Sequence, residues 1–271
     1  MSVENIPKLI FIVPYRNRTQ QKTHFSVYMN YIMEDYDPLD YEIYYSHQND
    51  KRPFNRGATK NIGFLIAKNK YPDHYKNITF IFNDIDTIPA IKNTLNYETI
   101  NGIVKHFYGF KFALGGIFSI KGDDFEKCNG FPNNWGWGLE DNMMQSRVLK
   151  NNLIINRDQF FALNNSAIIH LYDSPFRLIN NREPEKFQKN TLDSLINITD
   201  LEYNVEENNE NTANKLKSNQ HIININNFNT LINPTDEMFY TQNIFNNTKL
   251  TANKWEKSTK TDRWSMNKLY R

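Results

Sequence analysis

The sequence predicts an α/β protein with a mixed, mostly parallel central sheet flanked by helices. Short apolar runs, typical of buried strands, alternate with stretches whose apolar residues recur at helical spacing. Strands separated by helices of this length indicate βαβ units, in which the strands run parallel. The glycines add a third observation. All ten lie between Gly57 and Gly138, so turns and close approach to a ligand are expected in that part of the chain.

The first half of the sheet is predicted from three apolar runs with helical patterns between them. The first run, KLIFIVP, is a buried strand that ends at a proline, and NITFIFNDID is a strand that ends in carboxylates. The elements expected in this half are a strand at 8–14, a helix at 19–35, a strand at 41–47, a helix at 54–70 and a strand at 77–86.

The rest of the predicted domain is shorter in its elements and richer in glycine. From about Phe112 we expect a strand, a glycine-rich loop, a helix at 140–151 and two short strands at 153–157 and 167–172. These elements complete one α/β domain over residues 1–205. Residues 206–271 are polar, rich in asparagine and without helical periodicity, so we expect a loop-rich appendage there with one strand at 221–225.

Composition excludes several classes of protein. The 32 Lys and Arg against 30 Asp and Glu give a net charge of +2, which argues against a strongly basic nucleic-acid binder. A single cysteine, Cys128, cannot form an internal disulfide. No run approaches the roughly 18 apolar residues of a membrane span. We therefore expect a cytoplasmic protein with no transmembrane segment and no nucleic-acid partner.

The strongest local motif is Asn83-Asp84-Ile85-Asp86 at the end of a predicted strand. Residues i and i+2 of an extended segment point the same way, so both aspartates can face one crevice. In an open α/β sheet the ligand crevice lies at the carboxyl ends of the strands. Two hard oxygen donors there suit Mg²⁺ or Mn²⁺, although a turn with a solvated aspartate is the alternative.

Arginines follow the first and second predicted strands. Arg16 and Arg18 come directly after the first strand, and Arg56 opens the helix after the second. An arginine at a helix N-terminus opposes the helix dipole, which an anion nearby would offset. These residues suit a clamp on phosphate oxygens, and ordinary surface arginines are the alternative.

The densest motif is NGFPNNWGWGLED at 129–141. Two tryptophans, Trp135 and Trp137, flanked by glycines predict a mobile lid that stacks on a sugar and excludes water. Glu140 and Asp141 begin the next helix, where the dipole favours ionised carboxylates. Such a carboxylate beside a sugar hydroxyl is a candidate general base. A helix-capping pair is the alternative for the two acidic residues.

The order of these motifs resembles the β-1,4-galactosyltransferase family. VPYRNR, FNRG, the DID strand end, the Gly115-Gly116 pair, NGFPNNWGWGLED and the downstream His170 occur in that order over residues 8–205. GWGLED is also similar to chondroitin-type N-acetylgalactosaminyltransferase domains of the same superfamily. The resemblance implies a GT-A glycosyltransferase fold for residues 1–205, a UDP-sugar donor, Mn²⁺ and inversion at the anomeric carbon.

The resemblance also implies site residues. It implies that Asp86 and His170 ligate Mn²⁺, that Asp141 is the catalytic base, and that Trp137, Gly138 and Glu140 join Asp141 at the acceptor. The donor-binding residues implied are Pro14, Tyr15, Arg16, Asn17, Arg18, Phe54, Asn55, Arg56, Ile85, Asp86 and Trp137.

The chain departs from the family pattern at two places. Family members carry a further metal ligand at the positions of Ala167 or Tyr172. The aromatic residue that restricts the donor to galactose corresponds to Ala113, so the donor can be UDP-galactose or UDP-N-acetylgalactosamine. Animal members are anchored and disulfide-bonded Golgi proteins, and the lack of both features here favours a cytosolic or viral setting.

The expected function is transfer of galactose or N-acetylgalactosamine to a glycan or glycoconjugate acceptor, with formation of a β-glycosidic bond. One alternative is a non-catalytic protein of the same fold that binds a carbohydrate or UDP-sugar. A metal-dependent nucleotidyltransferase or phosphohydrolase is a second alternative, although it would not need the tryptophan loop.

Overall fold

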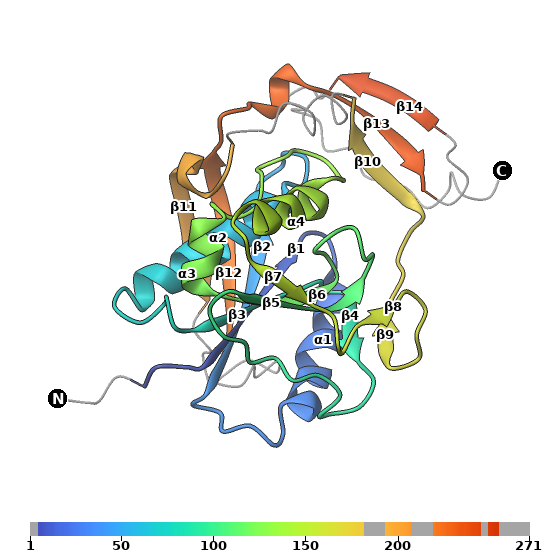
Figure 1. Ribbon diagram of the computed structural model, residues 1–271. Coiled ribbons are helices and arrows are strands. Elements are labelled where there is room, and N and C mark those ends of the chain that lie inside the picture. The colour runs from blue at the N-terminus through green and yellow to red at the C-terminus, as the bar shows by residue number, and fades with distance from the viewer. Residues whose placement is uncertain (1–4, 182–192, 207–218, 245–248, 255–271) are drawn as a thin grey trace.

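The computed structural model describes residues 5–181, 193–206, 219–244 and 249–254 (Figure 1). It contains four α-helices within these residues: α1 Thr19–Ile32, α2 Arg56–Lys70, α3 Gly122–Lys127 and α4 Glu140–Lys150. The strands are β1 Leu9–Tyr15, β2 Tyr41–Gln48, β3 Thr79–Asn83, β4 Thr87–Pro89, β5 Ile103–Gly109, β6 Ile117–Lys121, β7 Ile154–Asn156, β8 Phe161–Ala162, β9 Ile168–His170, β10 Phe176–Asn180, β11 Thr199–Glu206, β12 Gln220–Asn229, β13 Met238–Asn243 and β14 Lys249–Lys254.

The central sheet has the order β11-β12-β2-β1-β3-β6-β5-β7, with β8 paired to β5. Strands β12, β2, β1 and β3 are parallel to one another, as are β5, β7 and β8, while β6 runs antiparallel to both of its neighbours. The predicted mixed, mostly parallel sheet is confirmed. Because β1, β2 and β3 are parallel, the loops that follow them meet at one edge of the sheet.

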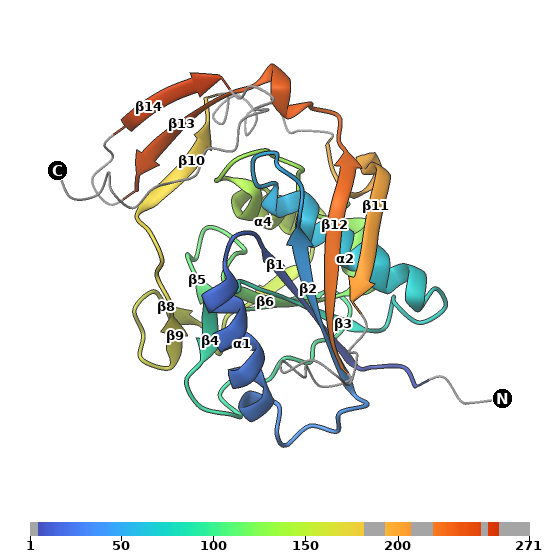
Figure 2. The ribbon, with the colours of Figure 1, turned by 180° about the vertical axis from the view of Figure 1, so that it is seen from behind.

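Helices cover both faces of this sheet. α1 lies on one face, and α2, α3 and α4 lie on the other (Figures 1 and 2). β1 shows why: Ile10 and Ile12 belong to the apolar cluster under α2, whereas Phe11 and Val13 belong to the cluster under α1. Successive strand side chains point to opposite faces, so an uninterrupted apolar run is what a strand buried on both sides requires.

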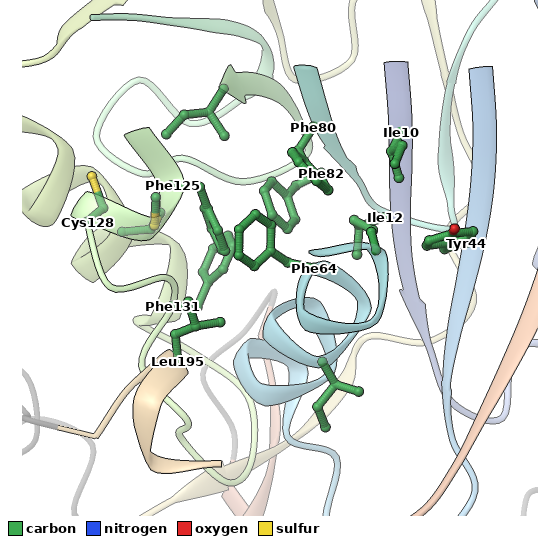
Figure 3. Close-up of a cluster of buried hydrophobic side chains, with 14 of the residues drawn as sticks. Ile10, Ile12, Tyr44, Phe64, Phe80, Phe82, Phe125, Cys128, Phe131 and Leu195 are labelled. Carbon is green, nitrogen blue, oxygen red and sulfur yellow. The ribbon is translucent and has the colours of Figure 1, made fainter. Parts of the chain in front are cut away.

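Phenylalanines dominate the core on the α2 side (Figure 3). The Phe82 ring of β3 lies 4.6 Å from that of Phe125 in α3, and Phe64 of α2 lies 4.7 Å from Phe125. Phe131, which directly precedes the tryptophan loop, packs on Phe82 at 5.3 Å. This rigid cluster anchors the elements that carry the site.

Two predictions for the middle of the chain are wrong in detail. The strand expected from Phe112 begins at Ile117, and Phe112 is exposed in a loop. Gly116 has φ +68, and a Cβ on it would lie 2.9 Å from the Tyr108 carbonyl carbon, so the glycine pair forms a tight turn before the strand. Strand β5 is not predicted from the sequence, because Lys105 and His106 interrupt its apolar run.

The central sheet continues past residue 205. β12 contains the strand predicted at 221–225 and pairs with β2 in the interior of the sheet. Ile223, Ile225 and Phe228 are wholly buried in the core beneath α2, which explains why this segment is not a peripheral loop. Residues 207–218, 245–248 and 255–271 of the expected appendage lie outside the described residues.

A second, antiparallel sheet of β10, β13 and β14 lies apart from the central sheet, beyond α4 in both views (Figures 1 and 2). It contacts the tryptophan loop, because the Trp137 amide donates to the Leu178 carbonyl of β10 at 2.7 Å. Among the helices of the described ranges, none combines the length and the apolarity needed to cross a membrane.

Candidate active site

The candidate site is built first from the turn after β3. The side-chain amide of Asn83 donates to the backbone carbonyls of Asp84 and Thr87, both at 2.8 Å. The backbone amide of Asp84 donates to the Gly116 carbonyl at 2.9 Å. These bonds hold the turn between β3 and β4 in one conformation. Asp84 and Asp86 therefore have fixed positions at the carboxyl edge of the sheet.

Five charged side chains from three elements meet beside this turn, and we call them the ion-pair cluster: Arg56 and Lys60 of α2, Asp84, and Glu140 and Asp141 of α4. The Arg56 guanidinium donates to Asp84, to Glu140 and, at 2.7 Å, to Asp141. Lys60 Nζ lies 2.9 Å from Asp141 Oδ1 and 4.0 Å from Asp84 Oδ1. Asp141 is thus held by two cations at once.

The electrostatics of the cluster favour an ionised Asp141. Burial raises the pKa of Asp141, but Arg56 and Lys60 outweigh burial and hold that pKa below its ordinary value. Burial lowers the pKa of Arg56, and the three carboxylates raise it well above its ordinary value. Both partners therefore stay charged at neutral pH.

Lys60 is a site residue that the sequence analysis missed. Its side chain is only 1% exposed, and its Nζ lies 4.4 Å from the centre of the Phe131 ring. A signal was available in the sequence, since Arg56 and Lys60 are four residues apart and so share one face of a helix. A buried lysine on that face requires a carboxylate partner.

Gly115 makes room for the Asp141 carboxylate. A Cβ on Gly115 would lie 2.9 Å from Asp141 Cγ and closer still to Oδ2. The Leu114 amide also donates to the Asp141 backbone carbonyl at 3.0 Å. Leu139, directly before the acidic pair, has φ +63, a strained conformation for leucine of a kind that clusters at functional sites.

Asp86 and His170 lie together, as the sequence analysis predicted for a metal pair. β4 pairs with β9, and the Leu171 amide donates to the Asp86 carbonyl at 2.8 Å. This pairing brings His170 Nε2 to 3.9 Å from Asp86 Oδ2. Tyr108 Oη is hydrogen-bonded to His170 Nδ1 at 3.0 Å, an arrangement that orients a ligating imidazole.

The donor set fits a divalent cation with a small number of protein ligands. Burial and the neighbouring charge of Asp84 raise the pKa of Asp86, so a cation would relieve an unfavourable buried carboxylate. One carboxylate and one imidazole suit Mn²⁺. Within the described ranges, no three His, Cys, Asp or Glu residues are grouped to hold a metal, so substrate or water oxygens would complete the coordination.

The predicted donor-binding arginines lie at the same edge but are already paired. Arg16 Nη1 lies 3.2 Å from Asp50 Oδ1, and Arg18 pairs with Asp173. Asn55 is wholly buried: its side chain accepts from the Ala58 amide to cap α2, and it donates to the Asn133 carbonyl at 2.9 Å. Its amide thereby joins α2 to the tryptophan loop.

The two tryptophans of the loop have different environments. Trp135 is 1% exposed, stacks on Phe228 at 5.3 Å and donates from Nε1 to the Ile232 carbonyl at 2.8 Å. The expectation that both tryptophans form a lid is therefore wrong for Trp135, because β12 supplies a core for it. Trp137 is 43% exposed and remains available to cover a ligand.

Exposed aromatic side chains also lie on the loop that is hydrogen-bonded to the start of α4. Phe110 and Phe112 stack with ring centroids 5.1 Å apart, and the side chain of Asn142 donates to the Phe112 carbonyl at 3.3 Å. Ala113, the position that corresponds to the donor-selecting aromatic, directly follows Phe112 and is buried, as is Leu114 after it. Exposed aromatic faces of this kind suit the apolar face of a sugar ring.

Comparisons with known proteins identify relatives of this chain. A model described as the N-terminal region of glycosyl transferase group 7 matches residues 3–98, and one described as the N-terminal domain of galactosyltransferase matches residues 104–172. β-1,4-Galactosyltransferase 4 of Cricetulus griseus is 31% identical over 180 residues, 62% of this chain and 50% of that protein. Xylosylprotein 4-β-galactosyltransferase of Caenorhabditis elegans is 28% identical over 193 residues, 68% of this chain and 64% of that protein. This chain spans about half the length of most of the curated relatives it matches.

Solved structures show the same architecture. The catalytic domain of Drosophila β-1,4-galactosyltransferase 7 in complex with xylobiose superposes with a TM-score of 0.63 at 23% identity, over 82% of this chain and 94% of that chain. A mutant of that enzyme in complex with manganese, UDP-Gal and xylobiose gives 0.61 at 22% identity, with the same coverage. The superposition shows that the chain has the GT-A fold, as the motifs predicted. Within that fold class, the chain belongs to the β-1,4-galactosyltransferase family.

Proposed function

We propose that this chain is an inverting, Mn²⁺-dependent transferase. It moves galactose or N-acetylgalactosamine from a UDP-sugar to a hydroxyl of a glycan or glycoconjugate acceptor. The observation that carries the proposal is the position of Asp141, which is held ionised by Arg56 and Lys60. Arg56 also contacts Asp84, which belongs to the same turn as Asp86. Arg56 thereby connects the proposed base, Asp141, to the turn that carries Asp86, one of the two proposed metal ligands.

Asp141 is the proposed base. As the acceptor oxygen attacks C1 of the donor sugar, its proton passes to the Asp141 carboxylate, and the bond between C1 and the diphosphate oxygen breaks. Attack on the face opposite the leaving group inverts C1. Gly115 leaves room for the carboxylate, and Arg56 and Lys60 hold it, so little reorganisation is needed at the reacting atoms.

Asp86 and His170 are the proposed metal ligands, and Mn²⁺ bound there would offset the charge that develops on the leaving UDP. Arg16 and Arg18, at the carboxyl end of β1, are the proposed contacts of the diphosphate. Arg177 of β10 joins them, because its Nη2 lies 3.7 Å from Asp173, the partner of Arg18. A protein of the same fold has been solved with manganese and UDP-Gal, which supports a divalent metal and a UDP-sugar as the ligands proposed here.

Trp137 and Glu140 are proposed to serve the acceptor. The exposed Trp137 ring lies on a loop anchored to β10, so it can cover the site and exclude water. Glu140 is buried and paired with Arg56, so it orients Arg56 as well as the acceptor. The exposed Phe110–Phe112 stack offers an aromatic surface for a sugar beside Asp141. Cytoplasmic location and a viral setting stay predictions from the sequence.

One observation favours the non-catalytic alternative. In the described part of the chain, no third His, Cys, Asp or Glu is grouped with Asp86 and His170. The sequence resemblance places a further metal ligand at Ala167 or at the exposed Tyr172. A weak metal site would leave a protein that binds UDP-sugars without transferring the sugar. The catalytic and the non-catalytic function differ in whether UDP is released when donor and acceptor are mixed.

The test is release of UDP with Mn²⁺ from UDP-galactose, UDP-N-acetylgalactosamine, UDP-glucose and UDP-N-acetylglucosamine, each with and without simple sugar acceptors. The expected result is release from one of the first two donors that an acceptor stimulates and that Asp141→Asn lowers to a small residual rate. Asp123→Asn is the control, because Asp123 pairs with Lys127 on α3, outside the site. Near-normal transfer by Asp141→Asn would remove the base assignment.

A further inference from the structure

Three neighbouring strands place a row of polar and aromatic side chains beside the predicted diphosphate arginines. Tyr15 of β1 is the register partner of His47 of β2, and His47 is the register partner of Asn224 of β12. The Tyr15 and His47 rings stack with centroids 4.5 Å apart and planes within 10° of parallel. Of these residues, only Tyr15 is predicted from the sequence to be a site residue.

The hydrogen bonds of the row determine which nitrogen of His47 carries the proton. Asn224 bonds to Glu206 Oε1 at 2.7 Å, and a carboxylate accepts only, so the Asn224 amide nitrogen faces Glu206. The Asn224 carbonyl oxygen then faces His47 Nδ1 at 2.8 Å, so Nδ1 must donate. In the neutral ring this leaves Nε2 as a lone-pair acceptor.

Nε2 of His47 has no hydrogen-bond partner among the described residues, and the ring is partly exposed at the carboxyl end of β2. Tyr15, by contrast, is buried and supports one face of the ring. An acceptor with a determined tautomer, a supporting ring and an open edge is a recognition element. It requires a ligand that offers an N–H or O–H donor.

We propose that His47 is the nucleobase-reading residue of this chain and that its Nε2 accepts a hydrogen bond from N3–H of uracil. This inference rests on the proposed function, because it assigns the base of the donor nucleotide to the same edge of the sheet. Asn224 and Glu206 act as positioning residues, since they set the tautomer without touching the base.

The chemistry of the two pyrimidines makes this contact selective. Uracil carries a proton on N3, whereas cytosine carries a lone pair there, so cytosine would place two acceptors against each other. A base that pairs edge-on with His47 lies nearly parallel to Tyr15, given the 10° between the rings, which is the orientation for stacking. Arg16, held by Asp50 at 3.2 Å, follows Tyr15 directly and can reach carbonyl or phosphate oxygens.

The test is calorimetric titration of the whole chain, with Mn²⁺ present, against UDP and CDP, which differ only in the base. We expect UDP to bind roughly 10- to 100-fold more tightly, the factor for one hydrogen bond lost and one acceptor left unpaired. His47→Phe keeps the ring stack and removes Nε2, so the preference should fall to within about threefold. Asn224→Ala frees the tautomer and should lower the preference partway.

His24→Phe is the matched control. His24 stacks on Tyr28 in α1 with centroids 5.5 Å apart and planes 12° from parallel, so the same substitution changes a similar stack away from the row. It should leave the preference unchanged. Equal binding of UDP and CDP by the unaltered chain, or a full preference in both His47→Phe and Asn224→Ala, would overturn the inference while UDP binding keeps the proposed function. Failure to bind either nucleotide would overturn both.

Discussion

Gly115→Ala tests whether the position of the Asp141 carboxylate matters, because it adds a single methyl group where that carboxylate lies. Gly115 has no positive φ, so alanine is compatible with its backbone, and the three atoms nearest to the added methyl all belong to the Asp141 side chain. The Cβ would lie 2.9 Å from Asp141 Cγ, whereas ordinary contact begins at 3.4 Å. The overlap with Oδ2 is larger, so the carboxylate must move by roughly 0.5–1 Å.

A displacement of that size has a known scale of effect. Misplacing a catalytic group by about 1 Å can cost about 100-fold in rate, equivalent to about 2.7 kcal/mol of transition-state stabilisation. We expect kcat for sugar transfer to fall about 10- to 100-fold. The affinity for UDP should change less than about threefold, because the predicted nucleotide contacts Arg16 and Arg18 lie in a different segment, between β1 and α1.

The assay is steady-state UDP release, with UDP affinity measured separately by calorimetry. A second arm repeats Gly115→Ala in an Asp141→Asn background, where the rate no longer depends on the carboxylate. There the added methyl should cost less than about threefold, because the two changes act on one group and are not additive. A kcat within threefold of the unaltered chain, or the same loss in both backgrounds, would refute the proposal that Gly115 sets the position of the catalytic carboxylate.

Three further predictions follow from single sites. Asp86→Ala should abolish the response of transfer to added Mn²⁺, and a variant that still shows saturable Mn²⁺ activation would place the ion elsewhere. Trp135→Ala should lower the free energy of unfolding by about 3–5 kcal/mol in urea titrations. Trp137→Ala should change that free energy by less than about 0.5 kcal/mol while it impairs transfer. Similar losses of stability in the two variants would contradict the different environments of the two tryptophans. Burial raises the pKa of Glu42, but the nearby His221 and hydrogen bonds from Lys70 and Tyr44 lower it to about 2 from 4.5. Because this folded-state pKa is depressed, Glu42 stabilises the fold fully above about pH 4.5 and loses that contribution as pH falls towards 2, so acid titrations of Glu42→Gln should be flatter across this window than those of the unaltered chain.

Sequence patterns predicted the elements whose signal is local. β1 and β3 are continuous apolar runs, and α2 has its apolar residues on one face, so each was placed within a few residues. β5 was missed because Lys105 and His106 are polar residues that only pairing with β6 and β7 makes part of a strand. β12 was predicted as a strand but not as an interior one.

The site shows the same division between local and distant information. The motifs named Asp86, His170 and Asp141, and the structure brings Asp86 to His170 through the pairing of β4 with β9. No local pattern shows that Arg56 would pair with Glu140 and Asp141, which lie 84 and 85 residues further along the chain. Those partners depend on how α2 and α4 pack over one face of the sheet.

By itself, the sequence determined the α/β class, the family and the residue types that stand at the carboxyl edge of the sheet. Hydrophobic period, glycine positions and motif order are properties of neighbouring residues, so they can be read without a fold. Only the tertiary structure decided that Trp135 is core and Trp137 is exposed, and that Asn224 meets His47 across 177 residues of chain. Such contacts follow from strand order and register, which depend on the packing of segments far apart in the chain.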